Sequence, residues 1–388
     1  MNTSAKPRRY LRALLTGVLA STLAAGLVAC GDAAEARRDG TLFVVATATA
    51  NEPLPVLPDS LSGVLKTAVE AGEGLLTVLI PQDDGSVAAA GSPIDIVVKR
   101  GDDVENDAGE IAKGLAPIRA AVDERLASAA SNSTSLDLLS GLNDAARRSS
   151  DSTIVAISSG LQTEGLADFA GLGWEFDNAD VIGQLSEAGF LPDLSGRRVY
   201  FSGLGEVAGK QEVLPEPMIR KVTSFWLDLC NAAKANSCDV VAGPANAGAT
   251  GSTTPAKLVP VPVFALPPLN NGIDELRLDS QALFGPDSAD LRPEATAQMG
   301  TLAAHLNNQG KAITITGHAW KWGPADSARD LSQRRAQAVA HALTSSGLRP
   351  ELITQVRGVG YDQLITPAGA DEDATAAANR VVVVDLAR

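Results

Sequence analysis

A strand, a polar loop and a helix follow one another between residues 313 and 343, and no other stretch constrains the fold as strongly. Ile313 and Ile315 alternate with threonines, which is the period of a half-buried strand. After the loop, one helical face is formed by residues that recur every three or four positions: Ser332, Ala336, Val339 and Leu343. Arg335 lies at the flank of this face. We expect its guanidinium to reach back over the first helical turn toward the loop that follows Gly317.

The same stretch contains a spaced set of residues: Gly317, His318, Gly323, Leu331, Ser332, Arg335, Ala336, Val339 and Leu343. These positions match without a gap the pattern Gly-His-Thr-Asp-x-x-Gly, then Asn, then Leu-Ser-x-x-Arg-Ala-x-x-Val-x-x-x-Leu. The stretch therefore resembles the OmpA-like domains of bacterial envelope proteins, which have this pattern. Residues 356–360 and 379–383 resemble the family's Gly-x-Gly segment and closing strand. The resemblance covers about residues 272–388 and implies a small α+β domain with a mixed sheet, which we place at residues 266–388.

The resemblance also implies a ligand, which is peptidoglycan or another cell-wall polymer. In the family, the motif's Asp holds the ammonium of a wall-peptide residue, the helix Arg holds its carboxylate, and the Asn assists. Here Trp320 stands at the Asp position and Ala328 at the Asn position, so only Arg335 remains. The candidate wall-binding residues are therefore Arg335, Trp320, Trp322, His318, Asn379 and Arg380.

Trp320 and Trp322 allow two interpretations. Their rings could stack on a sugar or peptide, or they could pack back onto the domain as a lid over the place of the family's pocket. His318 is interpreted as a residue that fixes the Gly-His turn, because a lone histidine without a partner base or a ligand set does no chemistry.

The amino terminus has the layout of an export signal. Basic residues precede a short apolar segment, and residues 27–31 read Leu-Val-Ala-Cys-Gly. This ending resembles the lipobox of bacterial lipoproteins, which implies a signal peptide at residues 1–29, acylation of Cys30 with fatty acids such as palmitate, and a tether at residues 30–40. An uncleaved signal anchor is the alternative. We expect an exported protein anchored by lipid to the outer face of the cytoplasmic membrane, or to an outer membrane if the cell has one.

The net charge bears on which ligands the protein can bind, and the cysteines bear on whether it holds a disulfide or a metal. The net charge is −14, and setting aside the four basic residues among the first 29 leaves −18, which disfavours binding to nucleic acid. The other two cysteines, Cys230 and Cys238, are predicted to form a structural disulfide, since the alternative metal site would need further ligands that nothing nearby supplies.

The first domain is predicted at residues 41–242 as a doubly wound, mostly parallel α/β sheet, because apolar strand patterns alternate with helical ones. The strand patterns cover residues 42–46, 75–80, 94–98, 153–157, 198–201 and 239–241. The helical patterns cover residues 108–129, 136–146, 181–188 and 217–235.

This order distantly resembles a von Willebrand factor A-type domain, which holds Mg²⁺ through Asp-x-Ser-x-Ser after its first strand and an Asp after its fourth. Thr47 and Ser159 stand at the two acidic positions here, so we expect no metal, although Glu52 could be argued into the site. A polar rim that could hold a ligand comprises Thr47, Thr49, Asn51, Ser158 and Ser159. Alternatively, these residues only form turns and caps.

Residues 243–265, rich in Gly, Ala, Pro, Ser and Thr, are predicted to be an interdomain linker. No catalytic motif is found, so we expect a binding protein without cofactor or enzymatic activity that links a membrane to the cell wall. The alternative is an envelope scaffold that has lost wall binding and recruits protein partners, and an enzyme ranks third.

Overall fold

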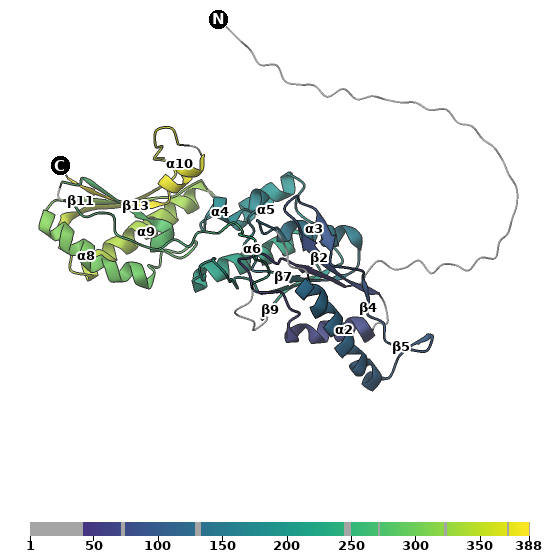
Figure 1. The fold of residues 1–388 in the computed structure, drawn as a ribbon. Helices are drawn as coiled ribbons and strands as arrows, with labels where there is room; N and C mark the ends of the chain where they lie inside the picture. Colours follow the sequence, from purple (N-terminus) through teal and green to yellow (C-terminus); the bar gives the residue numbers. More distant parts are fainter. Residues whose placement is uncertain are drawn as a thin grey trace, which may run out of the picture. The chain divides into compact units, whose positions relative to one another are not determined.

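The computed structural model describes residues 42–70, 74–128, 133–243, 250–270, 272–321, 324–370 and 372–387 (Figure 1). The predicted signal peptide, Cys30 and the tether lie outside the described residues. None of the helices in the described part is both long and apolar enough to cross a membrane.

Strands and helices alternate in the first two thirds of the chain. The strands are β1 (Leu42–Ala46), β2 (Leu75–Pro81), β3 (Val87–Ala89), β4 (Ile94–Asp95), β5 (Lys99–Arg100), β6 (Asp103–Val104), β7 (Thr153–Ile157), β8 (Arg198–Ser202) and β9 (Ser237–Val241). The helices are α1 (Ser62–Glu70), α2 (Ala108–Ser128), α3 (Leu138–Arg148), α4 (Phe169–Leu172), α5 (Asn178–Glu187) and α6 (Glu216–Ala232).

The first sheet has the strand order β3-β2-β1-β7-β8-β9, with β4 also paired to β2. Strands β2, β1, β7, β8 and β9 run parallel, while β3 and β4 pair antiparallel to β2. Strands β2 and β3 lie on one side of β1, and the later strands β7, β8 and β9 lie on its other side. This is the topology of a doubly wound sheet and confirms the predicted fold class.

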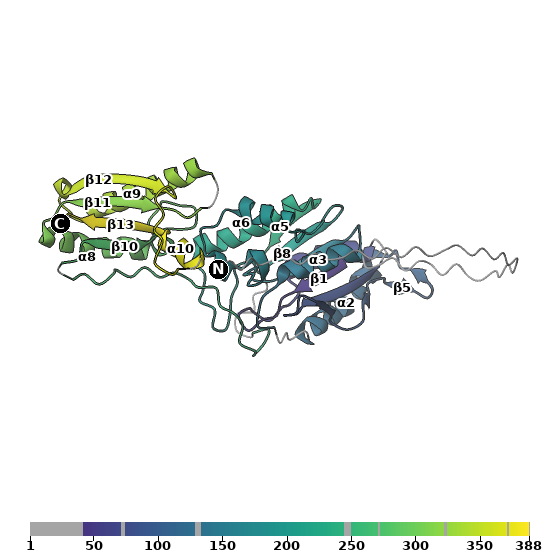
Figure 2. The ribbon, with the colours of Figure 1, turned by 90° about the horizontal axis from the view of Figure 1, so that it is seen from above.

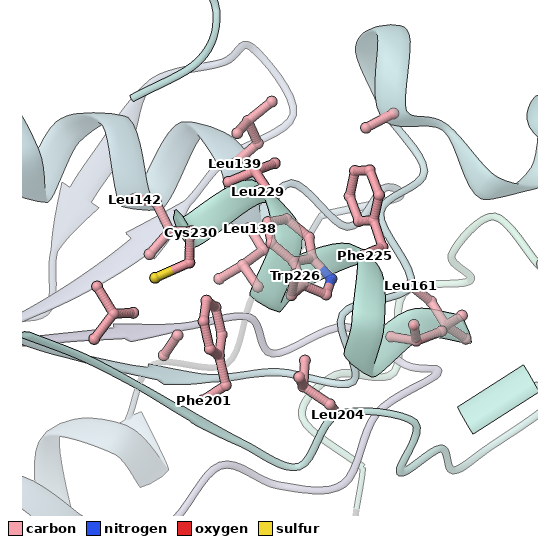
Figure 3. Packing of buried hydrophobic residues seen from close by; sticks show 14 of the residues in the cluster. Leu138, Leu139, Leu142, Leu161, Phe201, Leu204, Phe225, Trp226, Leu229 and Cys230 are labelled. Atoms are coloured by element: carbon pink, nitrogen blue, oxygen red, sulfur yellow. The ribbon is translucent and has the colours of Figure 1, made fainter. Parts of the chain in front are cut away.

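Both faces of the centre of this sheet are buried, because strands β1, β2 and β7 are almost continuously apolar. Along β1, Phe43 and Val45 point into a core shared with α3, α5 and α6, while Leu42 and Val44 point into a second core shared with α1 and α2. Figure 3 shows the first core, in which Trp226 and Phe225 of α6 pack among leucines of α3.

The carboxyl-terminal part forms a separate mixed sheet with its own core, as predicted. Its strands are β10 (Glu275–Asp279), β11 (Ile313–His318), β12 (Ile353–Gly360) and β13 (Val381–Leu386), and its helices are α7 (Ser280–Leu283), α8 (Pro293–Gln309), α9 (Ala325–Ser345) and α10 (Glu372–Ala378). The order is β10-β13-β11-β12, and only the β11–β12 pair is parallel. Figure 2 shows α9 running along this sheet.

Helix α9 touches the backbone of two strands at glycines. A Cβ on Gly317 would lie 2.1 Å from the carbonyl oxygen of Ser332, and one on Gly358 would lie 2.1 Å from the backbone nitrogen of Gln333. Only glycine allows this approach, which explains why both motif glycines lie opposite the helix. The loop that we placed directly after Gly317 begins one residue later, because β11 continues to His318 with a shift in register there.

One strand is shorter than predicted, and one helix was not predicted. The expected strand at residues 94–98 ends at Asp95, whose carboxylate accepts a hydrogen bond from the backbone N–H of Val97 and so starts a turn. Helix α1 had no predicted counterpart, although its buried Leu65 and Val69 have helical spacing.

Residues 250–261 of the predicted linker are held against the first domain, while Pro262 and Phe264 contact the carboxyl-terminal domain. The side-chain amide of Gln211 donates to the carbonyl of Val259 at 2.8 Å and accepts from its N–H at 2.9 Å. Lys257 forms an ion pair with Asp168 at 2.6 Å. These contacts attach this part of the interdomain linker to the first domain.

The predicted disulfide between Cys230 and Cys238 is present in the structure. It joins the last turn of α6 to β9, at the edge of the parallel sheet. An edge strand pairs on one side only, so the covalent link helps to hold it in place.

Candidate functional site

The predicted polar rim lies where β1 and β7 end, and it surrounds the carboxylate of Glu52. Glu52 itself is only 2% exposed. Its Oε1 accepts hydrogen bonds from the backbone N–H of Ser159 at 2.9 Å and from the hydroxyls of Thr47 at 2.7 Å, Ser159 at 3.0 Å and Ser158 at 3.2 Å. Its Oε2 accepts from the hydroxyl of Thr49 at 2.9 Å and its N–H at 3.2 Å.

Four of the five rim residues therefore donate hydrogen bonds to the Glu52 carboxylate. The fifth, Asn51, donates its side-chain amide to the carbonyls of Ala256 and Lys257. The rim holds the loop after β1 and leaves few polar groups for an outside ligand, in line with the turn-and-cap interpretation. Sequence reasoning missed Glu52 as the centre because it looked for an acid at the head of the loop, where Thr47 stands.

Glu206 lines the same small cleft, which also includes Ser158 and Ser159. Burial raises the pKa of this carboxyl above its usual value, and a hydrogen bond from the backbone of Gly243 only partly opposes that shift. The cleft therefore holds one carboxylate rich in donors and one that is poorly solvated.

Arg335 projects from α9 into a buried, partly polar site and is 1% exposed. Its Nε donates to the carbonyl of Ser288 at 2.9 Å, and its guanidinium carbon lies 5.1 Å from the centre of the Phe284 ring. Within the described residues, Nη2 has no hydrogen-bond partner. The side chain thus points toward the loop after α7, and the expected direction toward the loop after Gly317 is wrong.

The partner of Arg335 comes from the first domain. Its Nη1 lies 2.8 Å from Oε1 of Glu175, and the side chains are only 1% and 8% exposed. The same Oε1 makes no aligned hydrogen bond to the described residues, so the contact is electrostatic rather than a paired fork. Nothing in the local sequence around Glu175 could have predicted this long-range contact.

Glu175 lies within residues 173–176, Gly-Trp-Glu-Phe, which we call the acidic segment. Its first residue, Gly173, has φ +71°, and a Cβ there would lie 2.7 Å from Oε1 of Gln281 and 2.9 Å from Nη1 of Arg380. The N–H of Trp174 donates to the same Gln281 oxygen at 2.9 Å. The backbone of the acidic segment therefore lies directly against the carboxyl-terminal domain.

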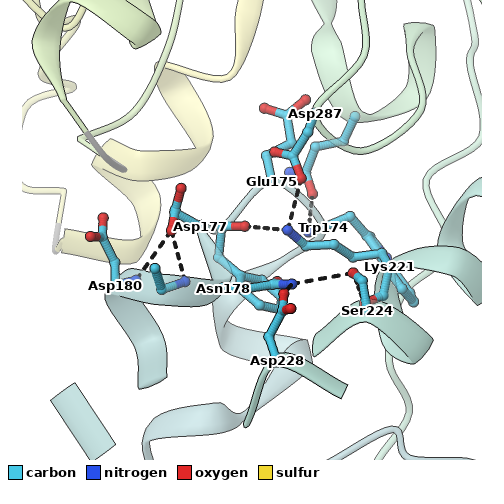
Figure 4. Close-up of polar contacts among 12 residues, drawn as sticks. Trp174, Glu175, Asp177, Asn178, Asp180, Lys221, Ser224, Asp228 and Asp287 are labelled. Carbon is cyan, nitrogen blue, oxygen red and sulfur yellow. Dashed lines mark hydrogen bonds and ion pairs between the residues drawn. The ribbon is translucent and has the colours of Figure 1, made fainter. Parts of the chain in front are cut away.

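A buried lysine links the end of the acidic segment to the carboxyl-terminal domain (Figure 4). Lys221 of α6 is buried, and its ammonium donates to the carbonyl of Phe176 and to Oδ2 of Asp287, the latter at 2.9 Å. Nearby, burial raises the pKa of Asp279, and the negative charge of Glu175 acts in the same direction. Acidic and basic groups from both parts of the chain thus meet around Arg335.

Comparison with known proteins assigns this part of the chain. Residues 283–379 match the OmpA family. The carboxyl-terminal domain is OmpA-like. The same comparisons give no support for the von Willebrand A-type resemblance of the first domain, which stays a prediction.

The relatives of the OmpA-like domain include two named peptidoglycan-associated lipoproteins. The protein from Pseudomonas aeruginosa is 31% identical over 107 residues, which are 28% of this chain and 62% of that protein. The protein from Pseudomonas putida is 30% identical over 107 residues, covering 28% and 63%. The chain thus spans a little under two thirds of these relatives' length. The solved structure of the peptidoglycan-associated lipoprotein from Burkholderia pseudomallei is 27% identical over 27% of this chain and 85% of that chain, with a TM-score of 0.23.

Two of the candidate wall-binding residues in the OmpA-like domain are used by the fold. Asn379 is fully buried. Its side-chain oxygen accepts a hydrogen bond from the backbone N–H of Ile365, and its side-chain NH₂ donates to the backbone carbonyls of Ile365 and Thr375. His318 is 8% exposed, and its Nδ1 lies 3.2 Å from the carbonyl of Gln363. Burial lowers the pKa of this imidazole. Both side chains fix the loop after β12. We expected His318 to fix the Gly-His turn, whereas in the structure it ends strand β11 and contacts a different loop.

The remaining candidates differ in exposure. Trp320 is half-buried, with the ammonium of Lys321 5.5 Å from its ring centre, and Trp322 lies outside the described residues. Arg380 is 6% exposed. Because Arg335 is covered, Arg335 and Trp320 do not line one open pocket.

Proposed function

We propose that this chain is an exported lipoprotein that associates with peptidoglycan through its OmpA-like domain and so links a membrane to the cell wall. The match of residues 283–379 to the OmpA family carries the proposal, together with the relatives named peptidoglycan-associated lipoproteins. Arg335 is the motif residue that would meet a wall-peptide carboxylate, since a guanidinium binds carboxylates through two parallel hydrogen bonds.

The structure adds support at the level of single atoms. Nη2 of Arg335 is buried and has no hydrogen-bond partner within the described residues, which is a costly state for a charged group. A carboxylate bound in the paired geometry would satisfy both terminal nitrogens. Arg335 therefore retains unused capacity for an anionic ligand, although Glu175 covers it in this arrangement.

Co-sedimentation of the whole chain with purified peptidoglycan sacculi tests the proposal. Arg335→Ala should reduce the bound fraction at least tenfold, because a charged hydrogen-bonded contact is worth about 1.5–3 kcal/mol. The matched control is Arg334→Ala, which removes the neighbouring arginine of the exposed Arg334–Asp330 ion pair. Equal sedimentation of both variants, with both shown to be folded by circular dichroism, would contradict a role for Arg335.

A second function is favoured by one observation, the ion pair between Arg335 and Glu175. If this contact is permanent, the OmpA-like domain has exchanged wall binding for a structural interface, and the chain is an envelope scaffold that recruits protein partners. Absence of sacculus binding by every form of the chain would favour this alternative. In both cases the chain acts by binding rather than by catalysis.

The lipid anchor is proposed from the lipobox-like residues 27–31. Several acyl chains at Cys30 would hold the protein firmly, since each buried methylene contributes about 0.8 kcal/mol. Cys30→Ser should move the protein from the membrane fraction to the soluble fraction. Continued tight membrane association of this variant would rule the anchor out.

A further inference from the structure

We propose that the acidic segment, residues 173–176, is a built-in competitor of the cell wall: Glu175 occupies the place of a wall-peptide carboxylate on Arg335 and must withdraw before the wall can bind. This inference rests on the proposed function. It concerns how that site is regulated and which group a ligand must displace.

The first support is the chemistry of the contact. Glu175 is a carboxylate on the one family cation that this domain retains, with Oε1 2.8 Å from Nη1 of Arg335. Arg–carboxylate pairs are frequently bidentate, yet here Nη2 lacks a partner among the described residues and the contact is not aligned as a hydrogen bond. A ligand with a better aligned carboxylate gains two hydrogen bonds that Glu175 does not make.

The second support is how the acidic segment is held. On its own side it is rigid, because the rings of Trp174, Phe176 and Phe225 pack edge to face around Phe169. The indole N–H of Trp174 also donates to the carbonyl of Pro260 at 2.7 Å. Since these contacts all lie within the first domain and residue 260, they survive when the segment leaves Arg335.

Withdrawal breaks at least three polar contacts between described residues: Glu175 with Arg335, Trp174 with Gln281, and Lys221 with Asp287. Asp287 is 59% exposed on its side chain, so water can replace Lys221 there. A closed state held by such contacts is open to competition from a ligand.

The competitor lowers apparent affinity by the fraction of molecules that are open, since only these bind the wall. If one molecule in a hundred is open, sacculi bind about a hundredfold more weakly than they would to an unobstructed site. Weakening any of the three closing contacts raises that fraction, whether or not the altered residue touches Arg335.

Two variants of the whole chain test this by co-sedimentation with purified sacculi. Glu175→Gln keeps the side-chain shape and removes the charge that pairs with Arg335. Asp287→Asn weakens the contact with Lys221 without altering Arg335 or Glu175, and asparagine tolerates the positive φ of 54° at this position. The matched control is Asp290→Asn, which removes an exposed acid from the same loop.

The expected result is that Glu175→Gln and Asp287→Asn bind sacculi at least tenfold more tightly than the native chain, while Asp290→Asn binds like the native chain. Adding Arg335→Ala to Glu175→Gln should abolish the gain. If the native chain and both variants bind equally, the competitor is refuted and the proposed function stands. If no form binds, the proposed function fails and the inference falls with it.

Discussion

Replacing Glu52 by glutamine tests whether its carboxylate organises the loop after β1. Glutamine has the same shape, but an NH₂ group takes the place of one oxygen. If it replaces Oε1, it faces the N–H of Ser159, which lies 2.9 Å from that atom; if it replaces Oε2, it faces the N–H of Thr49 at 3.2 Å. Neighbouring hydroxyls can rotate to accept a hydrogen bond, but a backbone N–H cannot. One buried N–H therefore loses its acceptor in either orientation.

That loss costs about 1–3 kcal/mol, and the surviving hydrogen bonds each weaken when the acceptor becomes neutral. Part of this is offset because an amide is less costly to bury than a charge. We expect the free energy of unfolding to fall by about 2–4 kcal/mol, a large share of the 5–15 kcal/mol typical of a domain. Urea unfolding followed by circular dichroism at pH 7 measures it, with the disulfide intact.

Glu206→Gln is the control in the same cleft. Burial raises the folded-state pKa of Glu206, so whatever stability it contributes is present below the unfolded value of 4.5 and lost as pH rises through the folded pKa. At pH 7 its charge therefore opposes folding, and glutamine should leave the urea midpoint unchanged or raise it. The assigned role of Glu52 is wrong if both variants shift the midpoint equally, or if Glu52→Gln leaves it unmoved.

Three further outcomes are expected. Gly358→Ala should cost about 2 kcal/mol or more in urea unfolding, because its Cβ would meet the backbone of Gln333, whereas Gly300→Ala, with open space around it, should stabilise α8 by about 0.5–1 kcal/mol. Burial lowers the pKa of His318, so native stability should fall as pH drops below 6.5, and His318→Asn should flatten that dependence in urea midpoints from pH 5 to 8. Millimolar Mg²⁺ should leave the melting temperature unchanged, since hydroxyl and amide donors already occupy the Glu52 oxygens; a rise with the logarithm of concentration would show binding.

The sequence predicted the first sheet well because its central strands are nearly unbroken apolar runs. Strands β1 and β7 begin and end at the predicted residues, and the alternation with helices was enough to give a doubly wound sheet. The short strand β4 was overextended, because Asp95 turns the chain through a side-chain hydrogen bond that periodicity does not detect.

The candidate sites were predicted less well, for a different reason. The motif identified Arg335 but not its partner, since Glu175 lies 160 positions earlier and meets it only through the packing of two separate cores. Likewise, the hydroxyl residues at the ends of β1 and β7 allowed either a ligand rim or simple turns and caps, and the sequence did not show that they donate to Glu52. Residue type gives the chemistry of a side chain, but tertiary packing determines whether that chemistry is free.

The connection between the two domains limits how the acidic segment can move. The chain is held by Gln211 at Val259 and, only three residues later, by Arg292, whose Nη1 donates to the carbonyl of Pro262 at 2.7 Å. A pivot this short permits rotation but keeps a displaced Glu175 near Arg335, at an effective concentration of order millimolar for a short tether. A single soluble wall fragment of weaker affinity would be outcompeted. A wall surface that presents many such groups at once would not be outcompeted by Glu175. The protein would then bind the assembled polymer but not its soluble fragments.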